Sequence, residues 1–345
     1  MEIQREKRKY DLLSMGEMLM RLSPPGNERL VCSDILEKKT GGAELNVSAG
    51  AALLGLKTGI ISKLPSNALG LYIRNQVRFN GVSDEFIVYD TDQDARLGLY
   101  YYESGAHPRK PGVVYDRKNS SFCKISADEF PAEMFSAARC FHTSGITLAL
   151  GEGPRKTAVE MIRRFKAAGA VISFDVNFRA NLWTGAEAKK CIEQILPYVD
   201  IFFCSEDTAR LTFLKEGSVT QIMESFSKDY PISVVASTQR IVHSPKRHTF
   251  GSVAYDAGKK QFYQEAAYEN IDVVDRIGSG DSYVAGFLYG LLAHSFDCEK
   301  AVAYGNAYGA VKNTIPGDLP SCSLDEIGQM IKNHNAKGRQ PEMNR

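Results

Sequence analysis

Four consecutive residues in the C-terminal third of the chain, Gly278, Ser279, Gly280 and Asp281, are the ones most suited to chemistry. The apolar residues that follow recur at i, i+3, i+4, i+7 and i+8 from Val284, which predicts a buried amphipathic helix starting just after Gly280. Glycines at a helix N-terminus let a ligand approach the free backbone N–H groups, which attract anions. An aspartate there would serve a hydroxyl that must lose its proton beside a phosphate, as when an alcohol attacks a γ-phosphoryl group.

Other interpretations of these residues stay open at the level of the sequence. Gly-Ser-Gly-Asp also suits an ordinary loop followed by an acidic first-turn residue, which the helix dipole favours. The chain contains no G-x-x-x-x-G-K-[ST] phosphate loop. A dinucleotide-dependent oxidoreductase would carry G-x-G-x-x-G after its first strand, and the chain has Met15-Gly16-Glu17-Met18 there instead.

The composition excludes several classes of protein. The chain has 345 residues, with 42 Lys+Arg and 41 Asp+Glu, so its formal net charge of +1 creates no general field for a nucleic acid or an anionic membrane. With 43% hydrophobic and 24% charged residues, it has the composition of a soluble globular protein. No stretch approaches the roughly 18 apolar residues of a membrane span. We therefore expect neither nucleic acid nor membrane as a partner.

The cysteines and the N-terminus indicate a cytoplasmic protein. The seven cysteines are odd in number and scattered, which argues against a C-x-x-C redox pair or a zinc knuckle. Such thiols usually act as small apolar fillers in a reducing compartment. The first nine residues mix charges of both signs and lead into no apolar stretch, so they do not resemble a secretory signal.

Strands alternate with helices along most of the chain. This order predicts an α/β protein with a mainly parallel sheet that is covered on both faces. The patterns predict strands at 10–15, 59–64, 139–143, 170–176, 200–204 and 232–237. They predict helices at 43–56, 69–79, 157–168, 186–196, 208–214, 282–294, 299–313 and 323–334.

Two segments interrupt this alternation. Residues 20–40 are poor in helix signals and contain the turn Pro24-Pro25-Gly26. Residues 85–122 show period-2 patterns with aromatic residues and Gly/Pro breaks, which indicate antiparallel β-structure. Together the two segments predict a small β-sheet lid over the core. The core would comprise residues 1–19, 41–84 and 123–335, followed by a polar tail at 336–345.

Two separated motifs resemble the signatures of the ribokinase-like (PfkB) carbohydrate kinases. Residues 273–287 are similar to the C-terminal signature, usually D-T-x-G-A-G-D, although Arg276 stands where threonine is usual and Ser279 where alanine is usual. Residues 41–55 are similar to the other signature, in the expected order and at about the expected distance. The resemblance covers about residues 10–335 and implies a ribokinase-like three-layer α/β/α sandwich with a small β-sheet lid.

The resemblance implies an ATP-dependent carbohydrate kinase that also uses Mg²⁺. Asp281 would be the catalytic base, and the N–H groups of Gly278, Ser279 and Gly280 would hold the charge of the transferring phosphoryl group. Nucleotide contacts would come from Ser205, Thr238, Arg240, Gly278, Gly280, Asn306 and Gly309. The family's N-x-x-E segment, linked to magnesium, falls where this chain lacks the asparagine. Glu206 and Asp207 are therefore the candidate metal contacts, in part through water.

Within the family the chain looks most like the 2-keto-3-deoxygluconate kinases. That resemblance implies substrate contacts from Glu17, Gly42, Asn46, Tyr100, Tyr115, Arg117, Arg179 and Asp318. The physics agrees for Arg117 and Arg179, because the arginine fork suits the carboxylate of a keto acid in a partly closed pocket. Plainer interpretations exist too, since Tyr100 could pack within the lid and Asp318 could be a turn residue after Pro-Gly.

The expected reaction is transfer of the γ-phosphoryl group of ATP to the C6 hydroxyl of 2-keto-3-deoxygluconate, giving 2-keto-3-deoxy-6-phosphogluconate. Alternatives are a kinase for a neutral ketose such as fructose, or for 5-keto-2-deoxygluconate, and the sequence does not separate gluco from galacto keto acids. A non-catalytic sugar sensor on the same fold is a further alternative, against which the intact Asp281 argues. Aromatic-rich β lids often pair edge to edge, so we expect a homodimer or a larger homo-oligomer.

Overall fold

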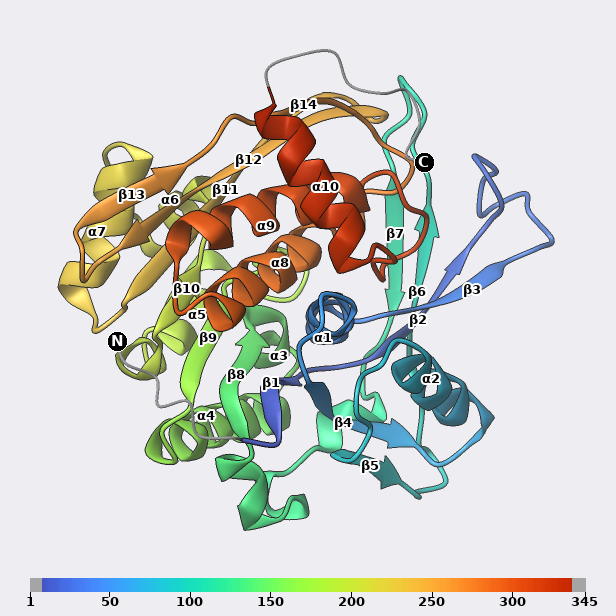
Figure 1. Ribbon diagram of the computed structural model, residues 1–345. Coiled ribbons are helices and arrows are strands. Elements are labelled where there is room, and N and C mark those ends of the chain that lie inside the picture. The colour runs from blue at the N-terminus through green and yellow to red at the C-terminus, as the bar shows by residue number, and fades with distance from the viewer. Residues whose placement is uncertain (1–7, 337–345) are drawn as a thin grey trace.

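Ten strands form the main sheet of the computed structural model, which describes residues 8–336 (Figure 1). Their order is β13-β12-β11-β10-β9-β8-β1-β4-β5, and β14 pairs with β12 outside this path. All neighbours from β11 to β5 are parallel, whereas β12 runs antiparallel to β11, β13 and β14. The strands are β1 (Tyr10–Met15), β4 (Thr58–Pro65), β5 (Ile87–Asp90), β8 (Ala138–Ser144), β9 (Val171–Asp175), β10 (Ile201–Phe203), β11 (Val234–Ser244), β12 (Arg247–Asp256), β13 (Gln261–Gln264) and β14 (Tyr268–Asp272).

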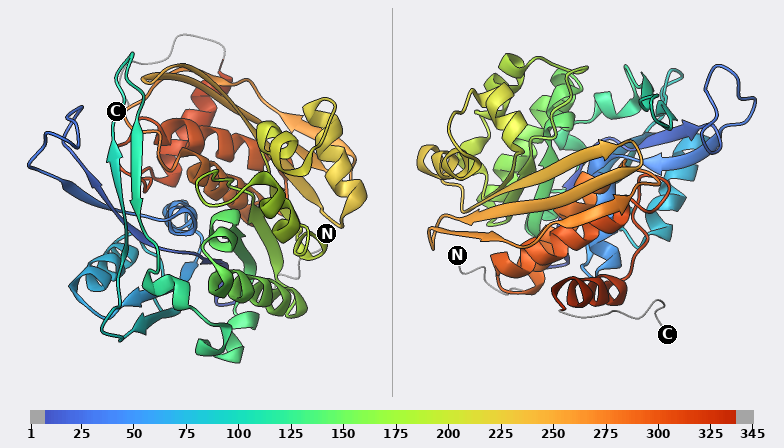
Figure 2. Two further views of the ribbon diagram at one scale, coloured as in Figure 1. Left: turned by 180° about the vertical axis from the view of Figure 1, so that it is seen from behind. Right: turned by 90° about the horizontal axis from the view of Figure 1, so that it is seen from above.

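Helices cover both faces of the main sheet (Figures 1 and 2). One face carries α1 (Ala43–Leu53), α2 (Ala68–Phe79), α8 (Ser279–Ala293), α9 (Cys298–Lys312) and α10 (Leu324–Asn335). The other carries α3 (Gly145–Ala149), α4 (Glu152–Ala167), α5 (Gly185–Ile192), α6 (Glu206–Phe213) and α7 (Val219–Asp229). Side chains of β1 alternate between the layers, since Leu12 packs in the α8 core and Leu13 in the α4 core. The predicted three-layer α/β/α sandwich is confirmed.

A second sheet of four strands lies beside the main one, and its long β6–β7 ribbon is clear in Figure 2. Its order is β3 (Glu37–Gly41), β2 (Leu19–Ser23), β6 (Gly98–Glu103) and β7 (Gly112–Asp116). Two segments distant in sequence thus meet in one small sheet, as predicted for the lid. The pairs β2–β3 and β6–β7 are antiparallel. Strands β2 and β6, which come from the two different segments, run parallel.

Several features of the fold differ from the prediction, and strands β12, β13 and β14 and helix α3 were not predicted. The strand expected near residues 86–89 of the lid is β5, which pairs in parallel with β4 at the edge of the main sheet. It follows α2, so β4, α2 and β5 form one strand-helix-strand unit that the period-2 pattern alone does not reveal. Strand β11 continues past 237 to Ser244 and turns back into β12 as a long hairpin. Helix α7 was not predicted, although Ser218 and Gln221 form a capping box at its start.

The ends of the chain fall mostly outside the described range. The predicted polar tail at 336–345 lies beyond the described residues apart from Ala336. Within residues 8–336, no helix combines the length and the apolar character needed to cross a bilayer.

Candidate active site

A cavity of about 580 Å³ lies at the carboxyl edge of the main sheet, and residues of β2, β6 and β7 line its other side. Open α/β sheets bind ligands at this edge, because the loops that follow parallel strands meet there. The cavity brings together every residue predicted for catalysis or substrate binding. These residues are Glu17, Gly42, Asn46, Tyr100, Tyr115, Arg117, Arg179, Gly278, Ser279, Gly280, Asp281 and Asp318.

The turn before α8 presents Asp281 to this cavity. Gly278 is the N-cap residue with a φ of 80°, in the left-handed region that glycine adopts most easily. Asp281 lies in the first helical turn, and both of its oxygens accept bonds from side-chain amides. Asn46 Nδ2 donates to Oδ2 at 2.7 Å, and Asn177 Nδ2 approaches Oδ1 at 3.5 Å. Two donors of this kind hold an ionised carboxylate in one orientation.

A second carboxylate, Asp175, ends strand β9 on the wall of the same cavity. Its Oδ1 accepts the backbone N–H of Asn177 at 2.9 Å, and Asn177 itself has a φ of 38°, which is uncommon outside glycine. Burial, and next the negative charge of Asp281, raise the pKa of Asp175 to about 7. Burial also raises the pKa of Asp281, against the bond from Asn46 and the charge of Arg179. The pKa of Asp175 therefore depends on the charge of Asp281.

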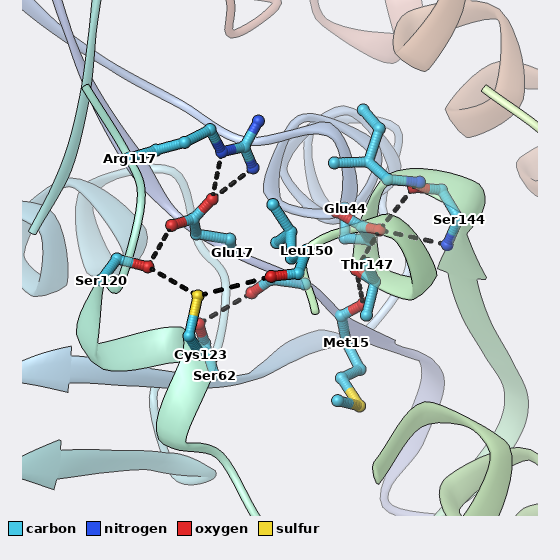
Figure 3. Close-up of polar contacts among 12 residues, drawn as sticks. Met15, Glu17, Glu44, Ser62, Arg117, Ser120, Cys123, Ser144, Thr147 and Leu150 are labelled. Carbon is cyan, nitrogen blue, oxygen red and sulfur yellow. Dashed lines mark hydrogen bonds and ion pairs between the residues drawn. The ribbon is translucent and has the colours of Figure 1, made fainter. Parts of the chain in front are cut away.

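Arg117 is held by an internal partner, as Figure 3 shows. Its Nε donates to Glu17 Oε2 at 2.7 Å, and its Nη2 donates to the same oxygen. Ser120 Oγ donates to the other oxygen of Glu17. Glu17 and Arg117 both line the cavity, yet they neutralise each other, so Arg117 offers a ligand only its remaining N–H groups.

Arg179, by contrast, has no carboxylate partner among the described residues. Its Nη1 donates only to backbone carbonyls, to Phe178 at 3.0 Å and to Asn177 at 3.4 Å. A partly buried guanidinium in this state is ready to bind an incoming anion. Of the two arginines predicted to face a carboxylate, Arg179 is the one with its charge uncompensated.

Glu44 is a third carboxylate of the cavity, and it is almost completely buried (Figure 3). Its Oε1 accepts the backbone N–H of Ser144 at 3.1 Å, the Ser144 hydroxyl at 2.7 Å and the Thr147 hydroxyl at 2.8 Å. Burial raises its pKa above the ordinary glutamate value. Through these hydrogen bonds, Glu44 connects the start of α1 with the start of α3 at the wall of the cavity.

Asp318 is not free to bind a ligand alone. It is buried, accepts a bond from the Tyr100 hydroxyl and forms an ion pair of 3.0 Å with Arg21. Burial raises the pKa of Asp318, and the charge of Arg21 opposes the rise. Tyr100 and Asp318 therefore border the cavity as a pair that already has internal partners.

A smaller cavity of about 180 Å³ continues the first one along the sheet edge. Four of the residues predicted to contact a nucleotide line it, namely Ser205, Thr238, Arg240 and Gly280. Arg240 and Arg276 also border the main cavity, and neither has a carboxylate partner within residues 8–336. An anion placed at the start of α8 would thus share the cavity with arginines that have no ion pair in the described chain.

Four other predicted residues do not reach either cavity. Asn306 is fully buried and bonds to Ser252 Oγ at 2.7 Å and to Glu265 at 3.1 Å, while Gly309 packs against the Phe250 ring. Glu206 pairs with Arg210 on α6 at 2.5 Å, and Asp207 is exposed on the same turn. Helix-cap geometry explains the acidic pair, because carboxylates favour the first turn of a helix regardless of any metal. The described residues contain no group of three or more metal-ligating side chains.

Comparison with known proteins decides the family. The model of the "pfkB family carbohydrate kinase" matches residues 9–321, which is most of the chain. The chain belongs to the PfkB family of carbohydrate kinases. The resemblance of the two sequence motifs to that family is thereby confirmed.

Several relatives of this PfkB kinase carry more specific names. The 2-dehydro-3-deoxygalactonokinase of Haloferax volcanii is 34% identical over 326 residues, which cover 94% of this chain and 98% of that protein. The 2-dehydro-3-deoxygluconokinase of Bacillus subtilis is 28% identical, with 90% of this chain and 92% of the relative covered. A crystal structure of 2-dehydro-3-deoxygluconokinase from Thermotoga maritima has a TM-score of 0.88 and 32% identity, covering 93% of this kinase and 99% of that chain.

Sequence reasoning missed several residues that shape this kinase's cavity. Asp175 and Asn177 stand four and two residues before Arg179, in the pattern D-x-N-x-R. This pattern was the signal in the sequence that could have identified them. Glu44 stands two residues before Asn46, in the first signature. Arg21 gave no signal, because only the pairing of β2 with distant segments shows what it contacts.

Proposed function

We propose that this kinase transfers the γ-phosphoryl group of ATP to the C6 hydroxyl of a 2-keto-3-deoxy sugar acid, with 2-keto-3-deoxygluconate as the first candidate. One observation carries the proposal. Asp281, at the N-terminal turn of α8, shares a cavity with an Arg179 guanidinium that has no carboxylate partner among residues 8–336. The carboxylate suits a hydroxyl that must lose a proton, and the guanidinium suits the acid group.

The role of Asp281 follows from its surroundings. The hydroxyl oxygen forms a bond to the γ-phosphorus while the bond to the β–γ bridging oxygen breaks; the proton passes to Asp281 and ADP leaves. Asn46 and Asn177 keep the carboxylate turned toward that proton. The buried Asn46 Oδ1 has no partner within the described chain, so it would accept a bond from a substrate hydroxyl.

The residues around the turn fit a nucleoside triphosphate. Backbone N–H groups at a helix N-terminus attract phosphate, and Arg240 and Arg276 add unpaired positive charge to the same cavity. Glu206 and Asp207 do not reach the cavities. Magnesium would therefore be held mainly by phosphate oxygens and water, which is how proteins commonly bind it with nucleotides. Bound Mg²⁺ would neutralise charge that develops on the phosphates.

The small sheet would limit wasteful hydrolysis of ATP. Tyr100, Val113 and Tyr115 lie on β6 and β7, and they line the wall that the small sheet gives to the cavity. With substrate bound, this wall would exclude water from the γ-phosphoryl group.

A galacto acid is the second candidate substrate. The Haloferax volcanii relative, at 34% identity, is named for 2-dehydro-3-deoxygalactonate, whereas the Bacillus subtilis and Thermotoga maritima relatives are named for the gluco acid. The 5-dehydro-2-deoxygluconokinase of Shouchella clausii is 25% identical over 95% of this chain. All three sugar acids carry the carboxylate that Arg179 would bind, so the carboxylate separates them from neutral sugars and not from one another.

A substrate panel tests the proposal. Release of ADP is measured with 2-keto-3-deoxygluconate, 2-keto-3-deoxygalactonate, 5-keto-2-deoxygluconate, fructose, ribose and adenosine. We expect kcat/KM for one of the 2-keto-3-deoxy acids to exceed that for the neutral acceptors by at least about tenfold, the effect of one charged hydrogen bond. A preference for fructose would refute the acid assignment. No phosphoryl transfer to any acceptor would favour a sugar sensor.

The catalytic assignment has its own test. Asp281→Asn keeps the size of the side chain and removes the base, so kcat should fall by about 10²–10⁴-fold. Circular dichroism and thermal melting control for folding. Near-normal turnover of the folded variant would show that Asp281 is not the base.

A further inference from the structure

Arg21 reaches out of the small sheet into the core. It lies on β2 and is only 3% exposed. Its Nη1 forms ion pairs with Asp275 at 2.7 Å and with Asp318 at 3.0 Å. Its Nε donates to Ser23 Oγ at 2.8 Å, and its guanidinium lies 4.2 Å from the centre of the Tyr102 ring. Arg21 is thus fixed on both the sheet side and the core side.

The two carboxylates that Arg21 holds flank the phosphate-binding turn. Asp275 precedes the turn, and its oxygens accept the backbone N–H of Ile277 at 3.1 Å and of Gly317 at 2.9 Å. The backbone of Asp318 packs directly on Gly278, where an added Cβ would lie 2.0 Å from the Asp318 carbonyl oxygen. The positions of these two aspartates therefore set the position of the turn.

A second buried cation supports the same loops from the other side. Lys312 is fully buried, and its Nζ donates to the carbonyls of Ile315 at 3.0 Å and of Asp275 at 3.4 Å. The two cations balance the two carboxylates, Asp275 and Asp318. Removing one member of such a set leaves a buried charge without compensation, so its neighbours must shift.

We propose that Arg21 is a positioning residue, which couples the docking of the small sheet to the geometry of the turn formed by residues 278–280. The proposal rests on the proposed function, because it takes that turn to be where the phosphoryl group is transferred. Arg21 itself lines none of the cavities described here and would act through Asp275 and Asp318. Loss of its charge would release β2 from the turn, so both the alignment of the phosphoryl group and the exclusion of water would suffer.

Arg21→Gln and the matched control Arg139→Gln test this coupling. Arg139 pairs with Asp11 at 2.8 Å near the amino ends of β8 and β1, away from the cavity. For both variants, kcat, both KM values, the melting temperature and the ratio of sugar phosphate to ADP formed are measured. Misplacement of reacting groups by about 1 Å can reduce a rate about 10²-fold. We expect a loss of this order in kcat for Arg21→Gln, with more ADP than sugar phosphate.

Arg139→Gln should lower the melting temperature while kcat and the product ratio stay within about twofold of the parent. Equal effects of the two variants on kcat and on the product ratio would overturn the proposal. If Arg21→Gln does not fold, Arg21→Lys replaces it, because lysine keeps a buried charge but lacks the planar guanidinium that contacts Asp275, Asp318 and Ser23 together. We expect a reduced kcat and an excess of ADP over sugar phosphate in that variant too, and wild-type values of both would overturn the proposal. An unexpected acceptor in the substrate panel would refute the acid assignment alone, because the same comparison can then be made with that acceptor.

Discussion

The arginines that line the active-site cavity or lie close to it differ in their ion-pair partners. Arg117 is neutralised by Glu17, and Arg21 by Asp275 and Asp318, whereas Arg179 donates only to backbone carbonyls. An acidic ligand gains most from a cation that is desolvated and unpaired. Of the arginines predicted to contact the substrate, Arg179 is the one without an ion pair in the described chain, which supports the proposal that it binds a substrate carboxylate.

Arg179→Leu should therefore weaken binding of the acid selectively. We expect the KM for the keto acid to rise by about tenfold or more, the effect of losing a charged hydrogen bond, with a smaller change in the KM for ATP. Steady-state kinetics with each substrate varied in turn would measure this. Arg163→Leu, which removes an arginine from beside Tyr198 on α4, serves as control. Equal rises in both KM values would contradict the assignment.

The neighbouring carboxylates predict a pH dependence. A base must be ionised, and burial raises the pKa of Asp281, so kcat/KM should fall with decreasing pH earlier than for an ordinary aspartate. Asp175, with a pKa of about 7, is coupled to Asp281 through their like charges. Because Asp175 still holds its proton where Asp281 ionises, Asp175→Asn should leave the acid limb in place, whereas Arg179→Leu removes the positive charge that lowers the pKa of Asp281 and should move the limb to higher pH. Asp11→Asn, far from the cavity, should leave the limb unmoved.

The same raised pKa affects stability. Folded Asp175 holds its proton up to about pH 7, whereas an unfolded aspartate loses it near pH 4, so the folded state binds more protons between these values. The resulting stabilisation is fully present below about pH 4 and is lost as the pH rises toward 7. Asp175→Asn should consequently raise the melting temperature, relative to the parent, more at pH 8 than at pH 5. The opposite order would show that Asp175 is not protonated in the folded state near neutral pH.

At the scale of the element, the turn before α8 depends on a backbone that only glycine adopts easily. Gly278→Ala would place a methyl group 2.0 Å from the Asp318 carbonyl oxygen at a φ of 80°. The left-handed backbone alone costs about 1–3 kcal/mol for other residues. We expect a clear fall in melting temperature and near-complete loss of activity.

Gly328→Ala is the matched control for that change. Gly328 lies on α10 with open space around it, so alanine should stabilise the helix by about 0.5–1 kcal/mol and leave activity intact. A tolerated Gly278→Ala variant with normal kcat would refute the importance of the turn.

At the scale of the whole molecule, the small sheet leaves an edge open. Strand β7 pairs only with β6, and its residues Gly112–Asp116 are all exposed, including Val114 at 58%. Such edges invite pairing with a second chain. We therefore expect the kinase to form a homodimer or a larger oligomer through this sheet.

Val114→Lys should break that association into monomers of 38.1 kDa, as measured by size-exclusion chromatography with light scattering. Ile241, on β11, is also 58% exposed, so Ile241→Lys adds the same charge at another apolar surface position and should leave the oligomer intact. A monomeric parent protein would contradict the expectation.

Periodicity alone predicted most elements of the main sheet and its covering helices, because side chains buried against two layers repeat with the spacing of the element itself. Strands such as β1 and helices such as α9 were found within one residue of their ends. Two edge regions were wrong in the prediction. Strand β5 was expected in the lid because its period-2 pattern does not show that it pairs with β4, and the second half of β11 was not predicted because its exposed residues lack a buried face and pair with the adjacent β12. Local spacing says nothing about which neighbour an edge strand will choose.

For the active site, the sequence by itself determined which residue types gather at one edge of the sheet. The loops that follow parallel strands meet at this edge, and the two motifs identify which loops carry the functional residues. Only the tertiary structure decided which of these side chains remain available. Glu17 with Arg117, and Tyr100 with Asp318 and Arg21, found partners more than 70 residues away. Charge compensation depends on distances in space that no local pattern encodes, so the sequence named both Arg117 and Arg179 and only the structure distinguished them.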